Sequence, residues 1–197
     1  MFLSLLIGLP LISALIVFLF PEKHARPVSL LLATVQFLFS LNLFFTFDKT
    51  SAALQLVEKH AWVPAFGINY FVGVDGISFW LVLLTTFFLP VVILASWKSI
   101  ETRVKFFHVN LFLLQTFMLG TFLSVDAVLF YIFFEASLIP MYFMIGIWGG
   151  TRRIYATMKF FLYTMTGSLL MLVGIITLMF MTKAQLGAMS SSLLDFY

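Results

Sequence analysis

Long apolar runs alternate with short polar segments along this chain. Each run holds about 20 residues, which is enough for a helix to cross a membrane, and five of the six carry no charged residue. A membrane β-barrel would instead show short segments of alternating hydrophobicity. The pattern therefore predicts an all-α fold, a single polytopic bundle of six transmembrane helices. Their expected bounds are 2–20, 28–47, 77–97, 106–123, 127–148 and 160–182.

The composition supports this class. The 197 residues are 62% hydrophobic and 10% charged, and the mean hydropathy of +1.12 lies far above that of a soluble domain. The chain has no Cys, so disulfides, thiolate metal sites and a cysteine nucleophile are excluded. The net charge of +3 is scattered over the loops, so we expect the lipid bilayer and no nucleic acid as a partner.

The longest loop, 48–76, carries a strand pattern in its second half. Apolar and other side chains alternate there at Ile68, Tyr70, Val72 and Val74. This alternation predicts a short strand or hairpin on the bundle surface, and Asp75 is a start signal for the next helix. The link 124–126 is very short, so the helices on either side of it should be antiparallel neighbours.

The second span contains two amides, Gln36 and Asn42. Amide side chains in membrane helices commonly form hydrogen bonds to neighbouring helices, and we expect this role for both.

The basic residues predict an orientation. The loops after the first, third and fifth spans hold 8 Lys and Arg, counting Lys159 with the last, whereas the other segments hold 3. By the positive-inside rule the first group faces the cytoplasm or matrix. Both termini and the long loop then face the opposite side.

One acidic residue stands apart from the other charges. Of the 19 charged residues, only Glu135 lies deep inside a predicted span, between Phe134 and Ala136. A charged residue at mid-membrane costs about 2.5–3.5 kcal/mol on insertion scales. Glu135 is therefore the first candidate for function, as a proton relay. The alternative is a structural Glu that stays neutral and hydrogen-bonded to a neighbouring helix.

Other residues of the same span lie close to this carboxyl group. Pro140 lacks the N–H for the carbonyl of Ala136 and should bend the helix beside the relay. A packing kink is the alternative reading. Tyr131 and Tyr142 share a helical face with Glu135 and would either line a wet path or only pack.

Two further titratable residues are candidates. Lys159, at the edge of the sixth span, either reaches the interface with its long side chain or serves as a second proton carrier. Histidine can titrate near physiological pH, and His108 lies near the start of the fourth span, where it would admit protons or simply face the interface. We find no Gly-rich phosphate loop and no metal-ligand cluster, so we expect no cofactor or redox site in this chain.

The chain resembles a known family at these positions. FFEASLIPMYFMIGIWGG, followed by TRRIYATMKFFLYTMTGS, is similar to membrane subunit M of respiratory NADH–quinone oxidoreductase (complex I), called subunit 4 in mitochondria. WVPAFGINYFVGVDGISFWLVLLTTF and FFHVNLFLLQ resemble the third and fourth spans of that family and the loop before them. The likeness covers nearly the whole chain.

The resemblance implies the N-terminal part of an antiporter-like subunit with fourteen helices. Such a subunit moves protons across a bacterial inner membrane, or across the mitochondrial inner membrane if the gene is organellar. NADH, FMN, iron–sulfur clusters and quinone belong to partner subunits, so this chain is an enzyme only as a subunit of H⁺-translocating NADH:quinone reductase. Glu135 matches the family glutamate that pairs with a lysine on the seventh span, and Lys159 also matches a family lysine.

Family members are more than twice this length, so we expect a fragment or a split or truncated gene. Two other functions remain open. A sodium or potassium/proton antiporter subunit of the Mrp type would use the same Glu135. A non-transporting bundle that only scaffolds partners would not need the charge at all.

Overall fold

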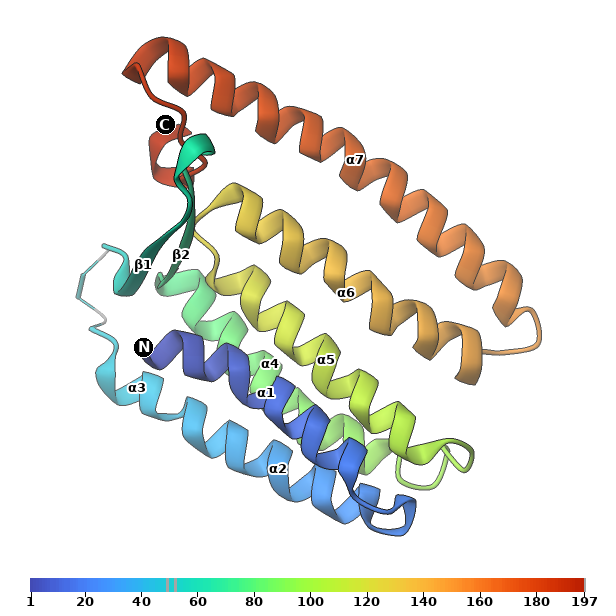
Figure 1. The fold of residues 1–197 in the computed structure, drawn as a ribbon. Helices are drawn as coiled ribbons and strands as arrows, with labels where there is room; N and C mark the ends of the chain where they lie inside the picture. The colour runs from blue at the N-terminus through green and yellow to red at the C-terminus, as the bar shows by residue number, and fades with distance from the viewer. Residues whose placement is uncertain (49, 52, 197) are drawn as a thin grey trace.

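Six long helices run side by side, and a small β-hairpin covers one end of them (Figure 1). The computed structural model describes residues 1–48, 50–51 and 53–196. The helices are α1 (Phe2–Leu19), α2 (Ala25–Ser40), α3 (Asn42–Thr46), α4 (Gly76–Ala95), α5 (Val104–Leu123), α6 (Ala127–Trp148) and α7 (Arg153–Leu186). The strands are β1 (Gln55–Val63) and β2 (Ile68–Val74), and the 3₁₀ turns are η1 (Glu22–His24), η2 (Pro64–Phe66) and η3 (Leu193–Phe196).

The fold class is the one predicted. The described residues include six helical segments long and apolar enough to cross a membrane. The second of these is built from η1, α2 and the short α3. The sixth lies in α7, which runs from Arg153 to Leu186 and so contains the whole predicted span 160–182. Lys159 lies inside this helix, one residue before the predicted span.

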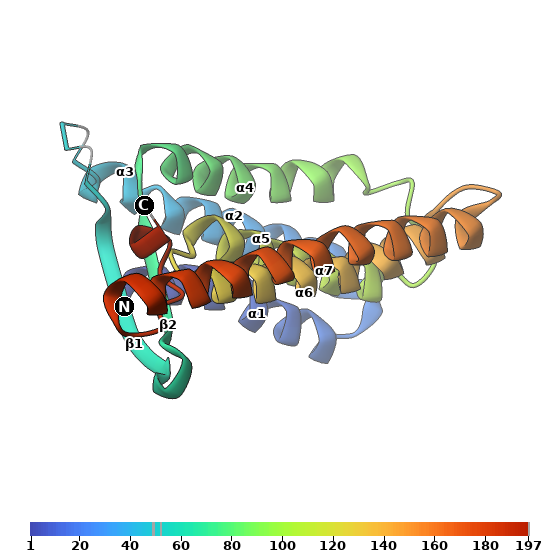
Figure 2. The same ribbon diagram turned by 90° about the horizontal axis from the view of Figure 1, so that it is seen from above.

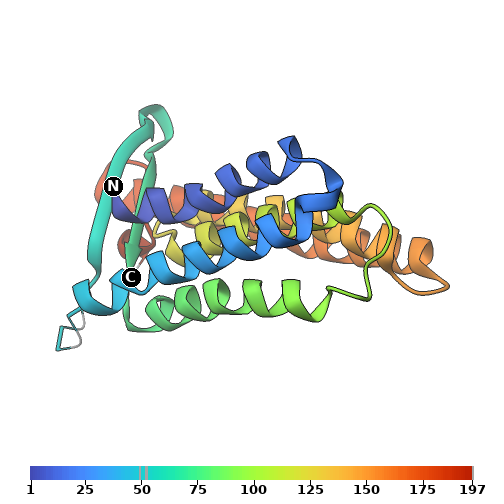
Figure 3. The ribbon, with the colours of Figure 1, turned by 90° about the horizontal axis from the view of Figure 1, so that it is seen from below.

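Helix α5 is the centre of the bundle. It packs against α1, α6 and α4, and its buried side chains include Leu111, Phe112 and Leu119. Helices α1, α2 and α4 lie on one side of it, with α2 between the other two (Figure 3). Helices α6 and then α7 lie on the other side (Figures 1 and 2). The α5–α6 neighbours predicted from their short link are confirmed.

The predicted hairpin is present. Strands β1 and β2 pair antiparallel, with Glu58 opposite Val72 and His60 opposite Tyr70. The chain turns through η2 and Gly67, whose φ of 67° favours glycine. Asp75 then caps α4 by accepting hydrogen bonds from the backbone N–H groups of the first turn, as its position in the sequence predicted.

A second set of backbone hydrogen bonds ties the hairpin to the ends of α6 and α7. Val125 N donates to Phe71 O of β2 (2.8 Å), and Leu193 N donates to Val125 O (2.9 Å). We call the segments 124–127 and 191–193, together with β2, the end clamp. The N-terminus, the hairpin and η3 lie at this end of the bundle (Figure 1).

Asp126 lies at the middle of the end clamp and is 0% exposed. Its Oδ1 accepts from the N–H groups of Val128 (3.0 Å) and Leu129 (3.1 Å), which caps α6. Its Oδ2 accepts from Asn69 N (3.0 Å) and from the hydroxyl of Ser191. One carboxylate therefore holds the start of α6, the hairpin and the segment after α7 together.

The two amides of the second span have different roles. Gln36 Nε2 donates to Ser13 Oγ of α1 (2.5 Å), so its predicted interhelical bond is confirmed. Asn42 Nδ2 instead donates to Phe39 O within the same segment (2.9 Å), so the prediction for Asn42 was wrong. The break between α2 and α3 gives this amide a local carbonyl, which it reaches more easily than another helix.

Candidate functional site

Helix α6 carries Glu135 nine residues after its capping residue Asp126, on the side that faces α7. The Glu135 side chain is half-buried. At about 1.5 Å of rise per residue, the carboxyl group lies roughly 13 Å along the helix from the end clamp. It therefore sits well inside the predicted span.

The closest partner of Glu135 is the hydroxyl of Ser168 on α7, which is hydrogen-bonded to Glu135 Oε1. Ser168 is 4% exposed, and its Oγ also lies 2.9 Å from Met165 O of its own helix. The hydroxyl of Tyr131, one turn before Glu135, interacts with both groups. We call Glu135, Ser168 and Tyr131 the carboxyl site.

Sequence reasoning did not identify Ser168. Helix α7 carries several hydroxyl side chains in an apolar background, and the sequence does not say which of them faces α6. The structure distinguishes them, because Thr164, Thr166 and Thr177 donate only to the carbonyl four residues earlier in α7. Ser168 could have been identified as a small polar residue at a packing position between two membrane helices.

Lys159 is not part of the carboxyl site. It lies nine residues before Ser168, which is about 13 Å along α7. Its side chain is exposed, and its Nζ lies 6.0 Å from the ring centre of Tyr155. Among the described residues, the recorded ion pair joins the N-terminus to Glu58, and no cation pairs with Glu135.

Tyr142 packs and does not join the carboxyl site. Its hydroxyl donates to Met158 Sδ (3.8 Å), and its ring meets that of Phe161 with centres 5.5 Å apart, so it joins α6 to α7. Pro140 is buried, and α6 continues through it from Ala127 to Trp148. The proline has no N–H to offer to the carbonyl of Ala136, one residue after Glu135.

His108 lies in the bundle interior, one turn into α5. It is 2% exposed, and its Nδ1 lies 2.8 Å from Val104 O. Within the described ranges, its Nε2 has no partner, and the same is true of the Gln115 amide, Gln36 Oε1 and Ser29 Oγ. His108 is thus one of several buried polar groups between α5 and its neighbours, and its role in proton entry stays a prediction.

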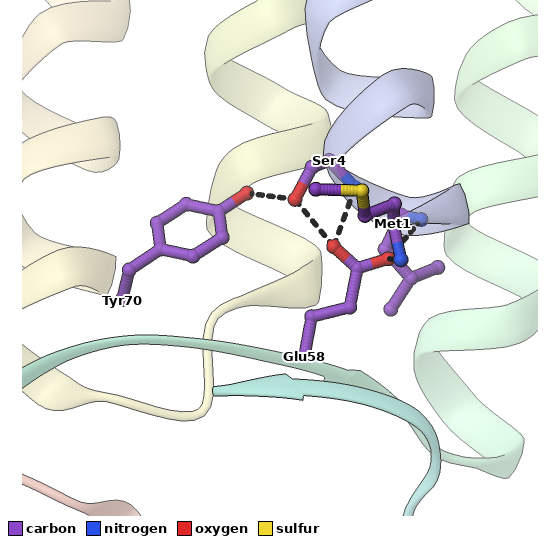
Figure 4. A network of polar contacts seen from close by, with 5 residues as sticks. Met1, Ser4, Glu58 and Tyr70 are labelled. Carbon is purple, nitrogen blue, oxygen red and sulfur yellow. Dashed lines mark hydrogen bonds and ion pairs between the residues drawn. The ribbon is translucent and has the colours of Figure 1, made fainter. Parts of the chain in front are cut away.

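A second buried carboxylate, Glu58 of β1, lies at the start of α1 (Figure 4). It is 8% exposed and accepts from Leu3 N (2.9 Å), Ser4 N (3.3 Å), the Ser4 hydroxyl and the N-terminal ammonium (2.6 Å). Tyr70 OH lies 2.8 Å from Ser4 Oγ. Burial by itself raises the pKa of Glu58, but the ammonium and these hydrogen bonds outweigh it and lower the pKa below its usual value.

The role of Glu58 is structural, since it caps α1 with a side chain from the hairpin. The sequence placed it in a polar loop among other charges and gave no sign of this contact. A capping residue 55 positions away cannot be found from local spacing, because the short-range signals of capping act over three or four residues.

Matches to two known families place this fold in a class of protein, the antiporter-like membrane subunits. Residues 124–194 match the family described as NADH:quinone oxidoreductase/Mrp antiporter, TM. Residues 2–125 match the family described as NADH-ubiquinone oxidoreductase chain 4, amino terminus. This chain therefore belongs to the family of NADH-quinone oxidoreductase subunit M, also named chain 4.

Two relatives illustrate the likeness. Over 160 residues the chain is 48% identical to NADH-quinone oxidoreductase subunit M of Rhodobacter capsulatus. That match covers 81% of this chain and 31% of the relative. It is 40% identical over 184 residues to NADH-ubiquinone oxidoreductase chain 4 of Marchantia polymorpha. That match covers 91% of this chain and 37% of the relative. The chain thus spans about a third of the length of the curated relatives it matches.

Solved structures agree with this assignment. A chain of respiratory complex I from Thermus thermophilus with bound NADH superposes with a TM-score of 0.80 at 26% identity, covering 100% of this chain and 38% of that one. A chain of the Mrp complex from Dietzia sp. DQ12-45-1b gives a TM-score of 0.74 at 19% identity. The superposition covers 95% of this chain and 20% of that one. The second likeness concerns the fold alone.

Proposed function

We propose that this chain forms part of a proton-translocating membrane subunit of NADH-quinone oxidoreductase, with Glu135 as the proton relay. The observation that carries the proposal is a titratable carboxyl group inside a membrane helix, held by a hydroxyl of the next helix. Ionisable side chains at such depth are expensive and usually mark ion or proton paths. The membership of the subunit M family supplies the complex in which this path would work.

The chemistry required of Glu135 is modest. Its carboxyl group binds one proton from one side of the membrane and releases it toward the other, and no bond other than O–H changes. The chain's own polar groups keep the carboxyl oriented toward α7. NADH, FMN, iron–sulfur clusters and quinone belong to partner subunits in this proposal, and their redox reactions shift the proton balance of Glu135 through the neighbouring membrane subunits.

We place the protein in a bacterial inner membrane, or in the mitochondrial inner membrane if the gene is organellar, with other membrane subunits as partners. The loops rich in Lys and Arg face the cytoplasm or matrix, and the end clamp, the hairpin and both termini face the opposite side. Protons then reach Glu135 from the end of the bundle that lies away from the hairpin. Lys159 and His108 are proposed as further carriers on that side.

The test is Glu135→Gln in the complete subunit within its native complex. Gln keeps the size and hydrogen bonding of the side chain but carries no exchangeable acid proton. NADH-driven proton uptake by membrane vesicles should fall at least tenfold, with the assembled complex quantified on native gels. Glu101→Gln, in an exposed loop at the opposite end from the hairpin, is the matched control and should pump normally. Normal pumping by Glu135→Gln would refute the relay and favour a scaffold.

A second candidate is an Mrp-type cation/proton antiporter subunit. It is favoured by the family match at 124–194 and by the shared fold. The two candidates differ in their requirements, because an antiporter moves Na⁺ or K⁺ against protons without NADH. Cation-dependent proton flux in vesicles lacking NADH would favour this second function, and its absence would favour the first.

A further inference from the structure

The Ser168 hydroxyl has two neighbours that both accept hydrogen bonds when Glu135 is ionised. One is Glu135 Oε1, and the other is Met165 O at 2.9 Å. A serine hydroxyl carries a single hydrogen and two acceptor lone pairs. Both contacts are therefore hydrogen bonds at the same time only when the carboxyl group carries the proton and donates it to Ser168 Oγ.

We infer that Ser168 is a positioning residue that serves Glu135 in both of its protonation states by turning its hydroxyl. The inference rests on the proposed relay function of Glu135. When Glu135 is protonated, its O–H donates to Ser168 Oγ, and the Ser168 hydrogen points at Met165 O. When Glu135 is ionised, the same hydrogen turns to Oε1, so the half-buried carboxylate keeps a donor.

The proton balance of this cycle is simple. The proton that Glu135 releases passes to the next carrier, and Ser168 keeps its own hydrogen throughout. The only change at Ser168 is a rotation about its Cβ–Oγ bond, because the two acceptors lie on different sides of the same oxygen. On reprotonation the rotation is reversed.

A hydroxyl suits this position better than the other groups available between two membrane helices. A backbone N–H or a Lys ammonium only donates, so it cannot accept the proton of the neutral carboxyl group. A carbonyl or a Met sulfur only accepts, so it gives the ionised carboxylate no donor. Ser168 is 4% exposed, so water does not easily replace it. Tyr131 presents a second hydroxyl to the same two groups and extends the arrangement toward the end clamp.

The test compares three variants of the complete subunit in its native complex. Ser168→Ala removes the hydroxyl, and Ser168→Thr keeps it. Thr164→Val is the matched control, because the Thr164 hydroxyl one turn earlier donates only to Phe160 O (2.8 Å). The first readout is the pH profile of NADH-driven proton uptake. The second is the infrared C=O stretch of the protonated carboxyl group, assigned to Glu135 as the band that Glu135→Gln removes.

We expect Ser168→Ala to displace the pH profile by about one unit, a tenfold change in proton affinity, since a hydrogen bond to a charged group is lost. The C=O band should move as well, while Ser168→Thr and Thr164→Val keep both readouts near wild type. If Ser168→Ala does not assemble, Ser168→Cys, a weak donor of similar size, should give a smaller displacement in the same sense.

The outcomes separate the two proposals. An unchanged profile and an unchanged band in Ser168→Ala, with pumping lost in Glu135→Gln, would overturn the role of Ser168 and leave the relay intact. Full pumping by Glu135→Gln would overturn both. A displaced profile in Thr164→Val of the same size as in Ser168→Ala would also overturn the inference, since it would trace the effect to helix packing.

Discussion

Replacing Glu58 by Ala should loosen the first turn of α1 without disturbing the rest of the bundle. Two backbone donors of α1, Leu3 N and Ser4 N, lose their acceptor, and Leu3 is 0% exposed. An N-terminal cap contributes about 1 kcal/mol, and a hydrogen bond to a charged acceptor about 1.5–3 kcal/mol. The N-terminal ammonium belongs to Met1, whose side chain is 99% exposed, so its ion pair with Glu58 is screened by solvent and we assign it no part of the loss.

We therefore expect local opening of the α1 terminus to become easier by about 2 kcal/mol, which is roughly a 30-fold change. Hydrogen–deuterium exchange of the N-terminal peptide, measured by mass spectrometry on the full chain in lipid nanodiscs, reports this opening directly. Glu58→Gln should fall between wild type and Glu58→Ala, because the amide oxygen still accepts but has lost its charge. Exchange as slow in Glu58→Ala as in wild type would refute the capping role, and Glu101→Gln provides the matched control.

The protection of the α1 terminus should depend on pH, because the Glu58 carboxyl group titrates. The pKa of Glu58 is lowered from its ordinary value of 4.5 because its ammonium and hydrogen-bond partners outweigh burial. A lowered folded-state pKa stabilises the folded state fully above the ordinary value, and the contribution is lost as the pH falls through the lowered value. Wild-type protection, corrected for intrinsic exchange, should therefore hold at neutral pH and fall in acid below about 4.5. Glu58→Ala should not show this acid step.

Three further predictions concern packing and buried polar groups. Asp126→Ala should destabilise the fold by about 2–4 kcal/mol, since it removes the acceptor for three backbone N–H groups and the Ser191 hydroxyl. A lower midpoint of thermal unfolding in detergent would show this loss. Gly120→Ala should cost about 1–3 kcal/mol, because its new Cβ would overlap the Phe133 ring of α6. The control Gly8→Ala, with no atom near its Cβ, should be neutral or slightly stabilising in the same melt. Gln115→Leu should raise the thermal midpoint by the equivalent of about 1–3 kcal/mol, because the buried amide has no partner among the described residues. A lower thermal midpoint would mean that water pairs with the amide.

The sequence predicted the helices well because membrane spans depend on local composition. Apolar runs of about 20 residues must be helical in lipid, since every backbone group needs a partner inside the same segment. The hairpin and the Asp75 cap were also predicted, because each depends on residues close together in the chain. The start of α7 at Arg153 lies outside the apolar run, because a helix also continues through residues that carry charge, and composition alone does not mark that start.

The partners of the carboxylates could not be predicted in the same way. Glu135 stood out because it is a charge in an apolar run, but its partner Ser168 lies 33 residues later and has no charge. Glu58 and Asp126 looked like ordinary loop charges, yet both are buried and bind groups more than 50 residues away. Their roles depend on how the hairpin and the segment after α7 fold back, and this tertiary information is not contained in local patterns.

The end clamp also has a mechanical consequence. It joins α6 and α7 at one end, whereas at the other end they are connected by the loop 149–152. The clamp therefore acts as a fulcrum, and the contact between Glu135 and Ser168 lies about 13 Å along the lever. A tilt of α7 by only about 5° around this fulcrum would separate the two side chains by about 1 Å, enough to break a hydrogen bond. A force applied by a neighbouring subunit at the Arg153 end of α7 would thus be converted into the opening or closing of one polar contact.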